Sequence, residues 1–257
     1  TEMKYRCNDS MFRLCTSLET PPALPAKVLD RECYHQMFHE CTKLKEAPEL
    51  PATKMAEYCY GLMFCECENL KIAPKLPATE LAPACYYSMF ASCINLTQAP
   101  EILPATTLES ACYSGMFFLC TALQKAPKLP ATTLAEGCYV CMFKECSSLT
   151  QAPELPATTL AEGCYAGMFN ECSSLTQAPE LPAITLTKEC YAGMFEDCSS
   201  LTQAPELPAS ELIDSCYLEM FKGCANLNYI KVGVMSLDNE FNATENWVDS
   251  VDGPGVF

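Results

Sequence analysis

The sequence is poor in positive charge, histidine, tryptophan and glycine. Sixteen Lys and Arg stand against 32 Asp and Glu, a net charge of −16 at pH 7. This balance excludes a phosphate-binding surface for DNA or RNA, and it equally excludes attraction to anionic membranes through basic patches. No apolar run approaches the length of about 18 residues that a transmembrane helix needs. Two histidines and 10 glycines leave little material for histidine-based catalysis or a phosphate-cradling glycine loop.

One repeated pattern occupies most of the 257 residues. Its nine copies are 26 residues apart, except for one step of 27 that Ile102 lengthens. Such a period predicts a stacked array in which each unit buries its faces against its neighbours. The first cysteines of the copies are Cys7, Cys33, Cys59, Cys85, Cys112, Cys138, Cys164, Cys190 and Cys216.

Each repeat predicts a helix followed by a short strand. In the seventh copy, apolar residues recur every four positions and would share one helical face, at Leu160, Cys164, Met168 and Cys172. The segment 175–182 contains two prolines, which remove two backbone donors, so its strand should be short.

The repeat reads Cys-Tyr-x-x-Met-Phe-x-x-Cys-x-x-Leu-x-x-Ala-Pro-x-Leu-Pro, with Cys172, Leu175 and Pro182 among the recurring positions. It resembles the BspA-like leucine-rich repeats of bacterial cell-surface proteins. The resemblance implies the α/β class: a curved leucine-rich-repeat solenoid of nine units of about 26 residues. Each unit would hold a short parallel strand and a helix. It also implies secretion or surface anchoring, and some family members look like adhesins.

Two regions follow from the repeat boundaries. Residues 1–226 are expected to form the leucine-rich-repeat solenoid, and residues 227–257 a strand-rich C-terminal cap in which Trp247 covers the last repeat. The first residues align with the middle of a repeat, so a signal peptide and an anchor are expected outside this sequence.

The 20 cysteines are interpreted mainly as small apolar fillers with free thiols. Two of them, Cys65 and Cys141, stand outside the repeated columns and are expected to be the exposed thiols. Disulfides across non-helical turns remain an alternative.

Zinc and catalysis have little support in the pattern. His35, His39 and Cys41 lie one repeat before Cys65 and Cys67, but two of these cysteines are expected to face the core. His35 and His39 are therefore interpreted as solvated side chains. No catalytic, cofactor-binding or metal residues are assigned, and the chain is not expected to be an enzyme.

The surface columns carry the functional signal. One position of the extended segment alternates in sign along the middle of the array and ends in three successive glutamates. It is interpreted either as a solubilising face or as a binding strip for a cationic patch, with a weak Ca²⁺ contact as a further possibility. The strip comprises Glu154, Glu180, Glu206, Gln151, Gln177 and Gln203.

The sequence therefore predicts a non-catalytic, surface-displayed repeat protein that mediates protein–protein or host-cell adhesion. Its partner would be a protein or another cell-surface macromolecule. A structural spacer in a cell-envelope or phage-like assembly is the first alternative. A glycan-binding module is the second, and it would need exposed aromatic side chains such as Tyr229 or Tyr165.

Overall fold

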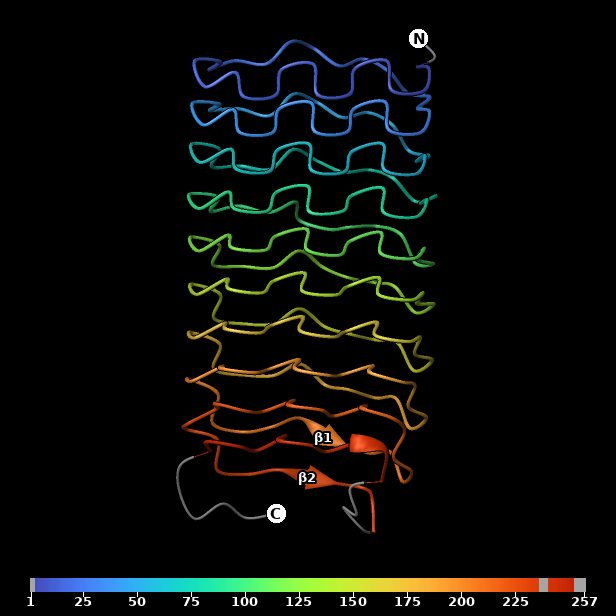
Figure 1. Ribbon diagram of the computed structural model, residues 1–257, viewed down its shortest axis with the longest axis vertical. Coiled ribbons are helices and arrows are strands. Elements are labelled where there is room, and N and C mark those ends of the chain that lie inside the picture. Colours follow the sequence, from blue (N-terminus) through green and yellow to red (C-terminus); the bar gives the residue numbers. More distant parts are fainter. Residues whose placement is uncertain (1–2, 236–239, 252–257) are drawn as a thin grey trace.

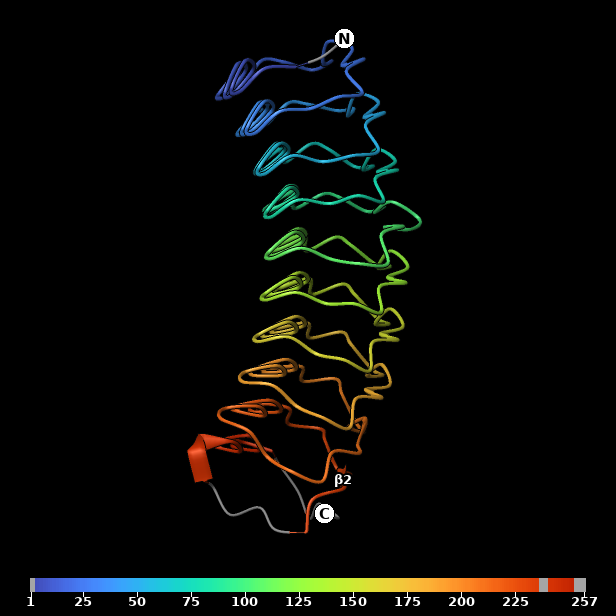
Figure 2. The same cartoon turned by 90° about the vertical axis from the view of Figure 1, so that its right-hand side faces the viewer.

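The computed structural model describes residues 3–235 and 240–251. Each 26-residue repeat forms one layer, and the layers stack along the long axis so that the chain runs from one end to the other (Figure 1). The view turned by 90° shows that the stack bends gently (Figure 2). We number the layers by the order of the repeats, so that layer 7 contains Cys164.

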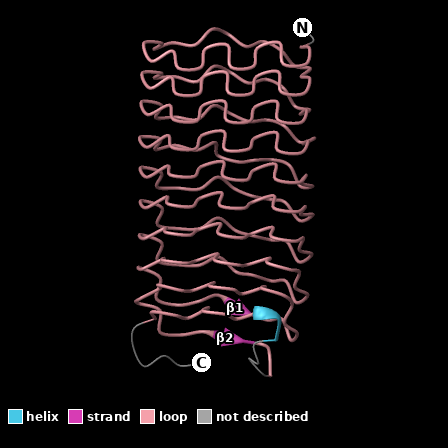
Figure 3. Cartoon of the chain, in the orientation of Figure 1, coloured by secondary structure: helices cyan, strands magenta, loops and turns pink. Residues whose placement is uncertain are grey.

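Regular secondary structure is nearly absent. Strand β1 (Glu206–Leu207) pairs in parallel with strand β2 (Lys231–Val232), and a 3₁₀ segment, η1, spans Glu240–Asn242. The rest of the described chain consists of turns, bends and single bridges (Figure 3).

The expected helices are replaced by a row of tight turns, which we call the turn ribbon (residues 161–172 in layer 7). Every fourth residue of the ribbon has a positive φ: 58° at Gly163, 61° at Gly167 and 59° at Glu171. This left-handed conformation is costly for residues with a Cβ, which explains the two glycines. It also excludes an α-helix, whose residues all have negative φ.

Backbone hydrogen bonds alternate along the ribbon. The N–H of Cys164 donates to the carbonyl of Ala161 at 3.2 Å and closes a turn. The next N–H, of Tyr165, donates to the carbonyl of Cys190 in layer 8 at 3.1 Å. An α-helix would direct each N–H to the residue four positions earlier in the same segment. The ribbon thus ties each layer to the next.

The prediction of an α/β leucine-rich-repeat solenoid with nine helix–strand units is therefore wrong. The four-residue spacing from Leu160 to Cys172 comes from a turn that repeats every four residues. In a helix of 3.6 residues per turn, the same spacing would drift around the axis by about 40° per step. The glycines inside the pattern were the available sign of positive φ.

The extended segments pair only sparsely, because prolines interrupt the ladder of donors. In layer 7, Leu181 and Ala183 are buried, while Glu180 before them and Pro182 between them are exposed. This alternation is that of a strand with one buried face. Apart from the β1–β2 pair, the described extended segments pair between layers through single parallel bridges such as Gln151↔Gln177.

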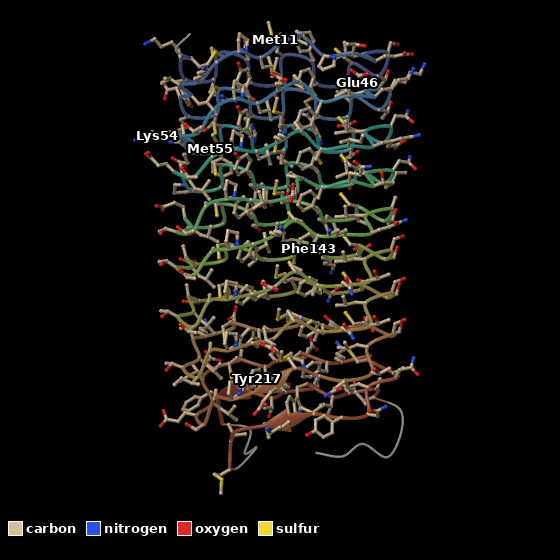
Figure 4. All side chains as sticks on the ribbon, turned by 180° about the vertical axis from the view of Figure 1, so that it is seen from behind. Met11, Glu46, Lys54, Met55, Phe143 and Tyr217 are labelled. Carbon is tan, nitrogen blue, oxygen red and sulfur yellow. The ribbon has the colours of Figure 1, made fainter. Side chains whose placement is uncertain are left out.

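Aromatic ladders fill the interior. The rings of Phe143 and Phe169 stack with centroids 5.7 Å apart, and Tyr139 and Tyr165 repeat this geometry at 5.7 Å. Phe143 lies in the middle of the molecule in Figure 4. Equivalent contacts link each layer to the next, so neighbouring layers are held about one ring spacing apart.

The C-terminal region adds further structure to the last repeat. The ring of Trp247 lies 6.3 Å from Tyr217 and 6.4 Å from Phe221, so it covers both aromatic ladders. Within the expected cap, 227–257, residues 236–239 and 252–257 lie outside the described part of the chain.

Candidate functional site: a groove along the extended segments

The extended segments of layers 5 to 8 form one side of the molecule that is open to solvent. Within a layer such a segment crosses part of the width of the stack: Lys54 of layer 2 lies at one lateral edge, and Glu46 lies on the other side of the middle (Figure 4). The alternation of buried leucine and exposed neighbours places the predicted strip here. All six of its residues are exposed: Glu154, Glu180, Glu206, Gln151, Gln177 and Gln203.

The surface is hollowed between layers 7 and 8. A cavity of about 860 Å³ is lined by the proline-rich segments of both layers. Polar side chains of the strip line it as well: Gln177, Glu180, Gln203 and Glu206. The proline rings make parts of the wall rigid, since proline fixes its own φ.

Two smaller hollows continue the first along the stack. One of about 450 Å³ includes Pro153, Glu154 and Glu180, and one of about 320 Å³ includes Lys128, Gln151 and Glu154. Successive hollows share residues: Glu180 belongs to the first and second, and Glu154 to the second and third. Together they make a continuous groove over layers 5 to 8, which we call the Pro/Glu groove.

The three glutamates of the strip do not share one environment. The carboxylate of Glu206 lies 2.7 Å from the Nζ of Lys231, and this hydrogen bond raises the pKa of Lys231. Glu154 and Glu180 have no ion pair within 4.0 Å among the described residues. Two of the three glutamates, Glu154 and Glu180, therefore carry negative charges that no neighbouring cation among the described residues neutralises.

Lys231 is the residue that sequence reasoning missed. It continues the charged column after Glu206, as the β1–β2 register Glu206↔Lys231 shows. The repeat pattern breaks after Leu227, so alignment alone does not carry the column that far. A lysine flanked by Ile230 and Val232, in an alternating segment, was the available signal.

The turn ribbon carries a second polar feature, where layers 2 and 3 meet. One ligand atom each from His39, Cys65 and Glu66 lie within 4.8 Å of one another. His39 and Cys65 occupy the same column in successive layers, directly after the ladder phenylalanines. Aligning the repeats would have placed them together.

The other members of the predicted zinc pattern lie elsewhere. The thiols of Cys41 and Cys67 donate to the carbonyls of Phe12 and Phe38 at 3.0 and 3.1 Å. The Nδ1 of His35 lies 3.3 Å from a carboxylate oxygen of Asp9. His35 therefore belongs to a different cluster from His39.

The expected exposure of the two cysteines outside the columns is wrong for one of them. Cys65 is 7% exposed, and burial, followed by the nearby Glu66 and Glu40 carboxylates, raises its pKa to about 12. Cys141 is half-buried, whereas Cys7 and Cys15 are exposed. All 20 cysteines are free thiols.

Within the described residues, none of the helical structure is long and apolar enough to cross a membrane. Comparison with protein-family models, with curated proteins and with solved structures finds no match for this chain.

Proposed function

We propose that this chain is a non-catalytic binding protein whose Pro/Glu groove holds an extended, positively charged segment of a partner protein. The observation that carries the proposal is the groove over layers 5 to 8, which has Glu154 and Glu180 on its surface without ion partners among the described residues. By its resemblance to BspA-like repeats, we further propose that it acts as an adhesion protein at a bacterial cell surface.

Charge supports a cationic partner. Successive ladder rings are 5.5 to 6.0 Å apart along the stack, and Glu154 and Glu180 occupy the same column of adjacent layers. Two unit charges at about 6 Å repel by about 0.7 kcal/mol in water. A cationic side chain between Glu154 and Glu180 would relieve this repulsion, and the net charge of −16 would steer a basic partner toward the protein.

The shape of the groove supports an extended ligand. Its floor is built from layers that are joined through buried aromatic ladders, so it is formed before any ligand arrives. A preformed site costs less ordering free energy on binding than one that must assemble. Glutamine side chains at 151, 177 and 203 add hydrogen-bonding groups at intervals of one layer.

The alternative functions are favoured less by the geometry. Tyr165, a candidate for stacking against sugars, is buried at 1% exposure in the tyrosine ladder. Tyr229 remains 39% exposed. A spacer role would need no groove, and it predicts that removing the two charges leaves all binding unchanged.

Peptide binding tests the proposal. Two fluorescent peptides of equal length are used. One is rich in lysine and proline, and the other has glutamate in place of each lysine. Each peptide is titrated with the parent protein and with the E154Q/E180Q variant. The matched control is E109Q/E136Q, which removes two exposed glutamates outside the groove.

We expect the basic peptide alone to bind, and E154Q/E180Q to weaken it about fivefold to tenfold, the effect of losing roughly 1 to 1.4 kcal/mol of charge attraction. The E109Q/E136Q control should bind the basic peptide as the parent does. Added salt should weaken peptide binding by the parent more than peptide binding by E154Q/E180Q. Equal weakening by both variants, or equal binding of both peptides, would contradict the proposal. Competition by Ca²⁺ at the same site would identify a cation site instead of a peptide groove.

A further inference from the structure

On the turn ribbon, the junction between layers 2 and 3 differs from the others in the side chains that follow the ladder phenylalanines. The position after the ladder phenylalanine holds His39 in layer 2 and Cys65 in layer 3, whereas layers 4 and 5 place Ala91 and Phe118 there. The N–H of Glu40 donates to the carbonyl of Cys65 at 2.9 Å, which holds the two ribbons in register beside this pair. Glu66 follows Cys65 and lies on the same side.

The three side chains bring three metal-ligating atoms together. The Nε2 of His39 lies 3.6 Å from an oxygen of Glu66, and the thiol of Cys65 completes a group whose atoms are all within 4.8 Å of one another. Two ligands of a tetrahedral zinc ion, each at about 2.0 to 2.3 Å, are about 3.3 to 3.8 Å apart. Small side-chain adjustments would therefore bring all three to one ion.

A fourth residue stands behind the histidine. The Nδ1 of His39 is buried and has no hydrogen-bond partner, and an oxygen of Glu40 lies 3.6 Å away. Histidines that bind metals usually donate their second ring N–H to a carboxylate, which orients the ring. A slight rotation of the imidazole ring would let the Glu40 carboxylate accept this N–H.

We propose that His39 Nε2, Cys65 Sγ and a carboxylate oxygen of Glu66 bind one Zn²⁺, with Glu40 orienting the imidazole. Nitrogen, sulfur and oxygen ligands in one set are the mixture that zinc accepts. On binding, the S–H bond of Cys65 is exchanged for an S–Zn bond, and the proton passes to solvent.

The site would leave one coordination position free. Side-chain exposure is 12% at His39 and 50% at Glu66, so the group is sheltered on the protein side and open beside the carboxylate. Three protein ligands and one open position are typical of zinc sites that hold water or an exogenous ligand. The ion would also join layer 2 to layer 3.

Among the described residues, this is the one group of at least three His, Cys, Asp or Glu side chains whose ligand atoms all lie within 4.8 Å of one another.

The repeats themselves supply substitutions that the fold accepts. Asn170 and Ala91 occupy the column of His39 and Cys65 in other layers, and Ser92 occupies that of Glu66. The test variants are therefore His39→Asn, Cys65→Ala and Glu66→Ser. Cys141→Ala, which removes a half-buried thiol from the ribbon of layer 6, is the control.

Zn²⁺ is titrated calorimetrically into reduced, metal-free protein, in a C7S/C15S background that lacks the two exposed thiols. Co²⁺ is added in parallel, because thiolate coordination produces a charge-transfer absorption. Thermal unfolding with a chelator present checks that every variant is folded.

We expect one Zn²⁺ per chain and a Co²⁺–thiolate band. His39→Asn and Cys65→Ala should each weaken zinc binding by more than about tenfold, since even orienting residues usually account for 10- to 100-fold. Cys65→Ala should also abolish the band, and Cys141→Ala should change neither. Absence of stoichiometric binding would overturn the proposal. So would a zinc affinity in the folded His39→Asn and Cys65→Ala proteins equal to that of the parent.

Discussion

The thiol of Cys172 donates a hydrogen bond to the carbonyl oxygen of Phe143 in the preceding layer, with an Sγ–O distance of 3.0 Å. The same carbonyl accepts the N–H of Cys146 within its own layer, also at 3.0 Å. The second cysteine of a repeat is thus more than an apolar filler, because it satisfies a second lone pair of a buried carbonyl. The same bond is made by Cys67, Cys93, Cys120, Cys146, Cys198 and Cys224.

This bond predicts unequal costs of replacing two equally buried cysteines. Both replacements lose side-chain volume, and Cys172→Ala also loses the bond to the Phe143 carbonyl. Among the described residues, the thiol of Cys164 donates no comparable bond to a carbonyl of a neighbouring layer. Because only Cys172→Ala removes a bond to a buried carbonyl, we expect it to lower the free energy of unfolding by about 0.5 to 1 kcal/mol more than Cys164→Ala. Urea unfolding measures the difference, and equal costs would reduce both cysteines to fillers.

Gly163→Ala tests the turn ribbon directly. The glycine has a φ of 58°, and no atom lies within 4 Å of a Cβ added there, so the substitution costs backbone strain without a clash. We expect a loss of about 1 to 2 kcal/mol in the free energy of unfolding. A helix would give the opposite sign, because alanine is favoured over glycine by about 1 kcal/mol in a helix.

Ser92→Gly is the matched reverse change, at a serine with a φ of 59°. It should leave stability unchanged or raise it slightly, since relief of strain offsets the added freedom of the unfolded chain. A clear loss of stability would contradict the left-handed conformation at this position.

Thiol labelling should separate the two exposed cysteines from the rest. In the native protein, Cys7 and Cys15 should react first with an alkylating reagent near neutral pH. Cys65 should react slowly, because the thiolate is the reactive form and burial raises the pKa of Cys65 to about 12. Mass spectrometry of the labelled peptides gives the order. Under denaturing conditions without reductant, all 20 cysteines should become reactive, and a shortfall would reveal disulfides.

Stability should fall at alkaline pH. Burial raises the pKa of Cys164, Cys172 and Cys190 from 9.0 to about 12, so the folded chain keeps protons that the unfolded chain releases. This contribution is complete below about pH 9 and is lost as the pH rises toward 12. Each such thiol can contribute up to about 1.4 kcal/mol per pH unit in this window. Urea unfolding at about pH 8 and pH 10.5, with reductant present, should show a drop of several kcal/mol. A flat profile would contradict the buried thiol columns.

Part of the groove could be read from the sequence, and part could not. The alternation around Leu181 predicts that Glu180 faces solvent, and the repeat places Glu154 and Glu180 one layer apart. The pairing of Glu206 with Lys231 depends on where the chain returns after the last repeat, which no alignment of copies contains. The meeting of His39 with Cys65 follows from the period, but only once the ribbon is known to stack residue upon residue.

The sequence by itself determined the period of 26, the columns of identical side chains and the buried Met-Phe pairs. These follow from composition at fixed spacing, because identical units must bury identical faces. The tertiary structure alone decided what the backbone does between those residues. A four-residue spacing fits a helical face and a row of turns almost equally well, and the choice depends on hydrogen bonds to the neighbouring layer. Each second N–H of the ribbon finds its acceptor about 25 residues further along, as Tyr165 does at Cys190, and no isolated repeat can supply that partner.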